Sequence, residues 1–307
     1  MTSATHAKRG KSASQTNATV LGTIGMVMFA GTLPATQLAL EGFGPVFITA
    51  SRAVLAAALA GIALAAFRVP RPKGADLRRL GMIALCLVVG FPFFIGMAMT
   101  TVGAGHGGVV LAVMPLATAV AGALVGGERP GLLFWFLAAL GGAVVLLFTL
   151  SAAKGALTAG DLFLMVAAVV AAFGYAYSGL LSRSVPGWSV IAWALVLSLP
   201  LTLAVTVLSA PPTLPTSVVA WTGLIYLGAI SMFLGFAFWN VAMAMGGIAK
   251  TGQIQLLQPF VTIAMAAAVT TETIELRQVV FAAAVVIIVA AAQRARVARP
   301  PAKAKKL

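Results

Sequence analysis

Ionisable and sulfur-bearing side chains are scarce in this sequence. Charged residues occupy 8% of its 307 positions, and the chain has one cysteine and two histidines. Soluble domains carry about 25% charged residues, so this composition excludes an ordinary soluble globular protein. The one cysteine, Cys86, lies in the apolar run "GMIALCLVVG". A disulfide framework and a thiolate metal cluster are therefore excluded as well.

Sequence motifs of common enzyme classes are also missing. The chain has no Walker A loop, no HExxH and no CxxC, and "AKTG" at 249–252 lacks the preceding glycine spacing of a phosphate-binding loop. A catalytic triad or a zinc site would have to use His6 in the N-terminal tail or His106 at a turn. The sequence predicts no enzyme activity, no cofactor and no metal site.

Hydrophobic side chains, by contrast, fill 61% of the positions. They form ten apolar runs, at 20–40, 45–67, 78–100, 105–126, 131–150, 159–181, 188–209, 216–245, 248–270 and 277–293. Each run approaches or exceeds the ~20 residues that a helix needs to cross about 30 Å of hydrocarbon. The linkers are too short for a soluble domain, so we predict an all-α integral membrane protein with ten transmembrane helices. Only glycines mark the turns near 100–105 and 246–248, and merging two runs there would change this count.

Lysine and arginine are distributed unevenly between the two predicted membrane faces. With the N-terminus inside, seventeen of them fall on the inner face, while Lys154 and Arg277 fall on the outer face. The positive-inside rule then puts both basic tails, 1–19 and 294–307, in the cytoplasm of a bacterial-type inner (plasma) membrane. The net charge of +14 thus indicates the lipid bilayer as a partner, and not nucleic acid. A cleaved signal peptide is the alternative for the first run, but an uncleaved first helix gives the even count that the charge pattern needs.

The two halves of the chain resemble each other. A shift of 144 positions aligns identical residues of the fourth and ninth runs: Gly103 with Gly247, Pro115 with Pro259, Thr118 with Thr262 and Glu128 with Glu272. We predict a first five-helix repeat at 20–150 and a second at 159–293. Because each repeat holds an odd number of spans, the second must enter the membrane from the opposite side, so the repeat is inverted. Inverted repeats are a common way to build two exchangeable gates around one site near the membrane midplane.

The fourth and ninth runs each carry a proline and end in a glutamate, as "VMPLATAVAGALVGGERPG" and "LQPFVTIAMAAAVTTETIE". This pattern resembles the drug/metabolite transporter superfamily, specifically its ten-helix EamA-type members, over nearly the whole chain. Among these, the sequence is most similar to the YddG-type exporters of amino acids. The resemblance implies a secondary transporter that exports amino acids or similar small metabolites. Relatives often have a glutamate before each proline, where this chain has Met114 and Gln258, so no carboxylate-based coupling is carried over to these positions.

A polar stripe crosses the ninth run, which contains "QIQLLQPF". Four residues follow the spacing of one helix face: Thr251, Gln255, Gln258 and Thr262. Gln258 lies about 15 Å from the start of the run, and Pro259 has no N–H to serve as helical partner of the Gln255 carbonyl. Polar groups at this depth must face protein or a water-filled cavity, because an unsatisfied group costs several kcal/mol in hydrocarbon. We predict that Gln255, Gln258 and Thr262 bind substrate, and hydrogen bonds that join two helices are the alternative.

Aromatic and amide side chains on neighbouring runs are further candidates for substrate binding. Trp239 and Asn240 are expected at a depth near that of Gln255. Tyr175 and Tyr177 offer an aromatic surface with a hydroxyl group. The alternative for each is packing or, for Trp239, a place in an interfacial aromatic belt.

Three basic side chains are candidates for functions beyond topology. His106 and Lys250 occupy matching positions in the two halves, at opposite membrane faces, where each would attract a substrate carboxylate near a gate. The alternative is a helix start near water and, for Lys250, a topology signal. Arg52 lies seven residues after Pro45 in the second run, and it either snorkels outward to water or has a role inside the bundle.

The predicted function is transport of a small-molecule substrate, an apolar or aromatic amino acid or a similar metabolite, by alternating access. All six acidic residues fall in loops or at helix ends, and Met114 and Gln258 cannot ionise. We therefore expect facilitated diffusion, because proton-driven carriers place titratable groups inside the bundle. The alternatives are proton-coupled drug or metabolite efflux through His106 and a solute channel. A monomer is compatible with this assignment, and the sequence leaves the oligomeric state open.

Overall fold

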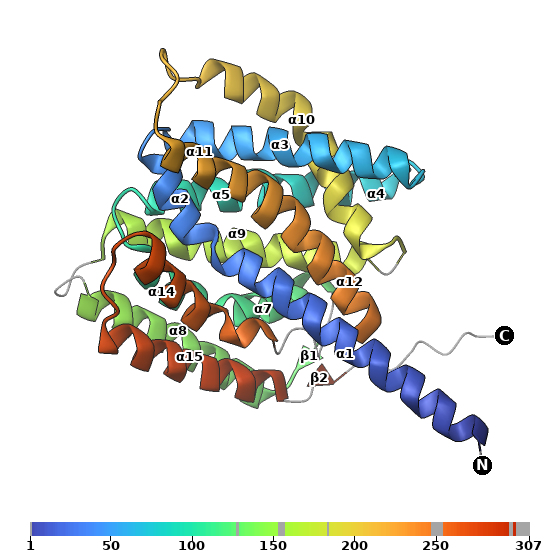
Figure 1. The fold of residues 1–307 in the computed structure, drawn as a ribbon. Coiled ribbons are helices and arrows are strands. Elements are labelled where there is room, and N and C mark those ends of the chain that lie inside the picture. Colours follow the sequence, from blue (N-terminus) through green and yellow to red (C-terminus); the bar gives the residue numbers. More distant parts are fainter. Residues whose placement is uncertain are drawn as a thin grey trace.

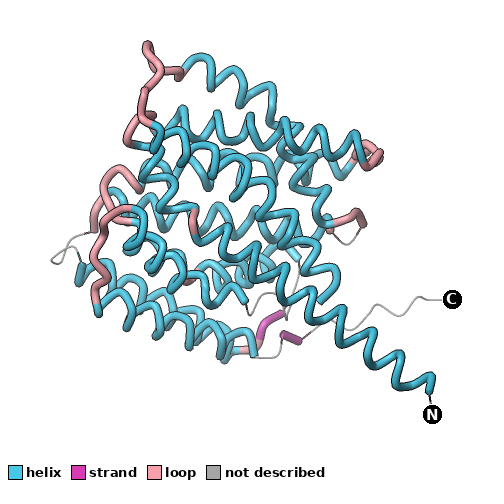
Figure 2. The backbone as a smooth tube through the Cα atoms, viewed as in Figure 1, coloured by secondary structure: helices cyan, strands magenta, loops and turns pink. Residues whose placement is uncertain are grey.

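The computed structural model describes residues 2–126, 129–152, 157–182, 184–246, 254–294 and 297–298. These residues form a bundle of helices that run side by side across Figure 1, and helix dominates the backbone view of Figure 2. The extended segments in the described part of the chain are β1 (Arg129–Pro130) and β2 (Val297–Ala298), which pair antiparallel with Arg129 opposite Ala298. Helix α1 extends beyond the bundle at the same end where α15 and β2 finish (Figure 1).

The helices follow one another with short connections. The first half contains α1 (Thr2–Ala30), α2 (Thr32–Leu40), α3 (Pro45–Ala66), α4 (Ala75–Ile83), η1 (Ala84–Gly90), α5 (Phe91–Ala98), α6 (Ala104–Leu111), α7 (Met114–Gly126) and α8 (Leu132–Ala152). The second half contains α9 (Ala159–Leu181), α10 (Gly187–Leu208), α11 (Val218–Ile225), η2 (Tyr226–Gly235), α12 (Phe236–Gly246), η3 (Gln255–Leu257), α14 (Gln258–Val269) and α15 (Leu276–Arg294).

In the described part of the chain, nine helical segments are long and apolar enough to cross a membrane. They are Thr16–Leu40, Pro45–Ala66, Asp76–Ala98, Ala104–Val125, Leu132–Ala152, Ala159–Leu181, Gly187–Leu208, Val218–Met243 and Leu276–Arg294. The prediction of an all-helical integral membrane protein is confirmed. The remaining predicted run, 248–270, is described only from residue 254 onward, where Gln255–Val269 forms a shorter apolar helix.

Two of the apolar segments break in front of a proline. A turn at Ala112 and Val113 separates α6 from α7, and Pro115 follows as the second residue of α7. The 3₁₀ segment η3 precedes α14, in which Pro259 is again the second residue. The sequence predicted a Gln255 carbonyl without its helical partner, but in the structure this carbonyl accepts the Gln258 N–H. The tighter 3₁₀ turn thus satisfies the group that the proline would have left open.

Two other segments are wound as wide π-helices, η1 in the first half and η2 in the second. A Cβ atom added at Gly90 would lie 2.9 Å from the Leu85 carbonyl oxygen, and one added at Gly235 would lie 3.2 Å from that of Ile230. Each glycine thus gives space to a carbonyl five residues earlier, where a side chain would crowd it. Such π segments are frequent at functional sites.

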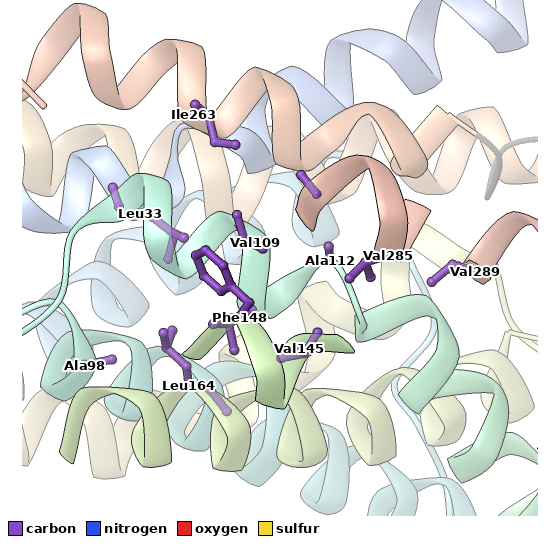
Figure 3. Close-up of a cluster of buried hydrophobic side chains, with 14 of the residues drawn as sticks. Leu33, Ala98, Val109, Ala112, Val145, Phe148, Leu164, Ile263, Val285 and Val289 are labelled. Atoms are coloured by element: carbon purple, nitrogen blue, oxygen red, sulfur yellow. The ribbon is translucent and has the colours of Figure 1, made fainter. Parts of the chain in front are cut away.

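One of the two large buried clusters packs α5, α6, α8, α9, α14 and α15 together. Phe148 of α8 is fully buried at its centre, with Val109 and Leu164 on either side (Figure 3). Elsewhere on α8, Leu133, Phe136 and Leu147 are exposed. In a membrane protein such apolar surface faces lipid, so packing of side chains, and not exclusion of water, holds these helices together.

Candidate substrate-binding cavity

A cavity of about 70 Å³ lies at the centre of the bundle. Its walls come from α1, α2, α3, α6, α7, α9, α14 and α15, from both π segments with the helices that follow them, and from η3. A single buried water needs ~10–15 Å³, so the cavity has room for several. Both prolines at the helix breaks, Pro115 and Pro259, line it.

One wall of the cavity is polar. The hydroxyl oxygens of Thr32 and Ser231 are hydrogen-bonded at 2.7 Å, which joins α2 to η2. The Gln255 amide nitrogen lies 3.5 Å from the Gln258 side-chain oxygen, at the outer limit of a hydrogen bond. Thr262 donates from its hydroxyl to the Ala30 carbonyl, with 3.0 Å between the oxygens. The predicted residues Gln255, Gln258 and Thr262 therefore do come together on the cavity, and Thr262 also joins α14 to α1.

Arg52 is the charged residue of this wall. It is the eighth residue of α3, its side chain is only 4% exposed, and it lines the cavity. The Nε atom is buried without a hydrogen-bond partner among the residues that the structure describes. The structure thus decides against the snorkelling alternative. Sequence analysis did not place Arg52 among the substrate-binding residues, although it is a lone basic residue well inside an apolar run.

The rest of the wall is apolar and aromatic. Its main members are Phe29, Leu33, Leu87, Phe91, Leu111, Met114, Met232 and Phe236. Tyr175, one of the predicted residues, also lines the cavity and stacks on Phe236 with 6.2 Å between ring centroids. The cavity therefore has one polar wall and one apolar wall.

Three of the predicted residues lie in packing contacts instead. Trp239 is 6% exposed and meets the edge of Phe29, with 6.1 Å between centroids, where α12 crosses α1. Asn240 donates from its side-chain nitrogen to the Gly187 carbonyl at 3.2 Å, which joins α12 to α10. Tyr177 packs against the buried cluster that contains α3, α4 and α10. The packing alternative describes the surroundings of all three.

His106 is held by a buried carboxylate near the start of α6. Its Nε2 atom lies 2.6 Å from an Asp161 oxygen, and its ring packs on Phe148 at 4.8 Å between centroids. The other Asp161 oxygen accepts the Thr158 N–H and hydroxyl, so Asp161 also caps α9. Sequence analysis missed this pairing because 55 positions separate the two residues. Lys250, the matching residue in the second half, lies outside the described residues.

Glu272 closes the same end of the bundle. Its two carboxylate oxygens accept the Ala104 N–H at 2.7 Å and the Gly105 N–H at 2.9 Å, at the start of α6. A carboxylate at a helix N-terminus satisfies unpaired donors and is favoured by the helix dipole. This contact fixes the segment after α14 to α6, and α14 itself packs along α6.

Comparison with known proteins places the chain in a family. The profile of the EamA-like transporter family matches twice, at residues 16–150 and 158–292. A Bacillus subtilis (strain 168) protein named "Uncharacterized transporter YdeK" is 42% identical over 260 residues, which cover 84% of this chain and 91% of the relative.

Two further comparisons are more distant. A "Probable terminal-alkyne amino-acid exporter" of Streptantibioticus cattleyicolor is 28% identical over 247 residues, covering 76% of this chain and 79% of the relative. One crystal structure matches with a TM-score of 0.64 and 21% identity, covering 90% of this chain and 97% of the other, which supports the fold alone. The two matches of the family profile together span most of the sequence, and the chain therefore belongs to the EamA-like transporter family.

Proposed function

We propose that this transporter exports amino acids with apolar or aromatic side chains, or closely related small metabolites, by alternating access. The observation that carries the proposal is the central cavity, which has a polar wall with Arg52, Gln255 and Gln258 and an apolar wall with Phe29 and Phe236. A polar wall suits the amine and carboxylate of an amino acid, and an apolar wall suits its side chain. The name of the Streptantibioticus relative, an amino-acid exporter, supports the same substrate class.

Matching positions of the two halves supply the cavity, which supports an inverted repeat as its framework. At the shift of 144 positions, six pairs contribute both members to the walls: Leu87 with Ser231, Pro92 with Phe236, Leu111 with Gln255, Ala112 with Leu256, Met114 with Gln258 and Pro115 with Pro259. A site built from both repeats at equivalent places can be reached from either side when the repeats exchange conformations.

Side-chain contacts at one end of the bundle support ten crossings. Glu272 contacts the start of α6, so the two must lie on the same membrane side and an even number of crossings must separate them. Five candidate spans lie between Ala104 and α14, and the helix Gln255–Val269 supplies a sixth. Arg277 donates to the Ser151 carbonyl at 2.9 Å, and three candidate spans lie between them, so the same helix is needed again.

With both termini in the cytoplasm, as the lysine and arginine distribution predicts, the Glu272 contact lies at the outer end. Packing of α6 against α14 and α2 then closes the cavity to the outside. We infer an inward-facing or occluded state of the cycle, from which an exporter loads its substrate.

Transport by purified protein in liposomes tests the function. We expect the protein to take up labelled phenylalanine or leucine and to exchange it faster when unlabelled substrate is present on the other side. Such counterflow is a property of a carrier with alternating access, and a channel would not produce it. If the protein transported none of a panel of labelled amino acids, the proposal would be contradicted.

Facilitated diffusion remains our proposal for the energy source, and the His106–Asp161 contact at 2.6 Å gives a specific reason to test proton antiport against it. We expect an imposed pH gradient to change the rate modestly without driving accumulation. Uphill accumulation that collapses with a protonophore and disappears in His106→Ala would instead establish antiport.

A further inference from the structure

Arg52 carries a charge without a counter-charge in the described part of the bundle. Four of the described acidic residues contact groups other than Arg52: Asp76 contacts Arg79, Asp161 contacts His106, Glu272 contacts the start of α6 and Glu275 contacts Arg277. Glu41 follows α2 in the turn before α3. A buried ion without a partner is strongly destabilising, and such residues inside membrane segments are as a rule functional.

The surroundings of Arg52 lack anions but not neutral polar groups. Thr32 and Ser231 bond to each other, while the Gln255 and Gln258 amides lie at the limit of hydrogen-bond distance. The cavity wall, as far as the structure describes it, therefore offers one cation and several groups that both donate and accept. An ammonium group would find only neutral acceptors there, whereas a carboxylate would find a guanidinium with free donors.

We propose that Arg52 binds the substrate carboxylate, and that the carboxylate, not the amine, is the group that a substrate must have. The inference rests on the proposed function, because it assigns one part of the substrate to one part of that cavity. A planar guanidinium can bind a carboxylate through two parallel hydrogen bonds. The transported class is then apolar monocarboxylates, with amino acids as members whose amine is tolerated.

Three substrates that differ by one group test this assignment on the wild-type protein. Phenylalanine has both groups, 3-phenylpropanoate lacks the amine, and phenylalaninamide has no carboxylate. We expect the first two to exchange in liposomes and to raise the melting temperature of purified protein. Phenylalaninamide should be transported about 10- to 100-fold more slowly, the range expected for loss of a charge-assisted hydrogen bond, and should cause no thermal shift.

Variants of Arg52 give the reciprocal test. Arg52→Gln should lower phenylalanine transport by about 10- to 100-fold and abolish the thermal shift, and Arg52→Lys should retain part of both because it keeps the charge. Arg79→Gln makes the same chemical change at an exposed residue and should behave like wild type. If a variant fails to fold, the comparison of the three substrates on the wild-type protein still decides.

The two proposals fail differently. If wild-type protein exchanges phenylalanine and phenylalaninamide equally well, or if Arg52→Gln transports phenylalanine at the wild-type rate, the role of Arg52 is overturned and the transport function stands. If no amino acid is exchanged, the proposed function fails, and the thermal shift with 3-phenylpropanoate alone then decides whether Arg52 binds carboxylates. A wild-type protein that none of the three compounds stabilises or that transports none of them contradicts both.

Discussion

The two halves of the chain contribute equivalent positions to one cavity, but they do not contribute equivalent chemistry. Leu111 and Met114 in the first half correspond to Gln255 and Gln258 in the second. The positive charge of the cavity comes instead from the first half, in which Arg52 lies. The second-half positions that match Arg52 at shifts of 143 and 144 are apolar. In the function that we propose, the matched positions give the site its geometry, and the positions that differ between the halves bind the substrate.

The largest effect is expected where a matched pair is alike in both halves. Ile95 and Trp239 match at the shift of 144, and both are buried in packing. Truncation of a buried tryptophan leaves a large void, so Trp239→Ala should reduce the free energy of unfolding by about 3 kcal/mol. Thermal denaturation in detergent measures this loss. We expect alanine and phenylalanine transport to fall together, and selective loss of the larger substrate would return Trp239 to the binding site.

The next effect concerns a pair that differs in chemistry. Gln258→Leu gives the second half an apolar side chain like its counterpart Met114, and it removes an amide from the membrane interior. Folding should be preserved, while transport should fall about 100-fold if the amide bonds to the substrate. Liposome exchange measures the rate, and Met114→Leu is the matched control that keeps an apolar side chain. Wild-type transport in Gln258→Leu would assign the glutamine to helix association alone.

The smallest effect concerns the two glutamates that match across the halves, Glu272 and Glu128. Glu272→Gln weakens the two hydrogen bonds to α6, a loss of about 1–2 kcal/mol that shifts the conformational equilibrium by about 5- to 30-fold. We expect more labelling of Leu111→Cys by an impermeant thiol reagent from outside, in a Cys86→Ala background. An inverted repeat predicts the opposite change for Glu128→Gln. Changes of the same sign in both variants would contradict the inversion.

The sequence was sufficient for nine of the ten predicted membrane spans, because hydropathy acts locally. It also pointed to an irregular helix at Pro259, although the prediction of an open Gln255 carbonyl was wrong because a 3₁₀ turn satisfies it. The polar stripe of Gln255, Gln258 and Thr262 was also predictable, since polar groups at mid-depth in a membrane have few alternatives. Tyr175 was predicted as a candidate and lines the cavity.

The rotation of each helix about its own axis was not predictable from the sequence. This explains both the site residues that the sequence missed and those that lie away from the cavity. Trp239 and Asn240 lie at a suitable place along the chain but turn toward α1 and α10. Arg52 turns toward the cavity, although the neighbouring alanines and leucines of α3 do not define a polar face. The contact of His106 with Asp161 depends on how two separate helices meet, which neither local sequence encodes.

The π segments have a consequence for insertions and deletions. A π turn takes up about one residue more than an α turn. Removing one residue from η1 would restore the α-helical register and rotate all that follows by about 100°, which turns Phe91 and Pro92 away from the cavity. The same change in η2 would displace Phe236. The side chains of η1 and η2 can therefore vary, but the number of residues in each segment is fixed.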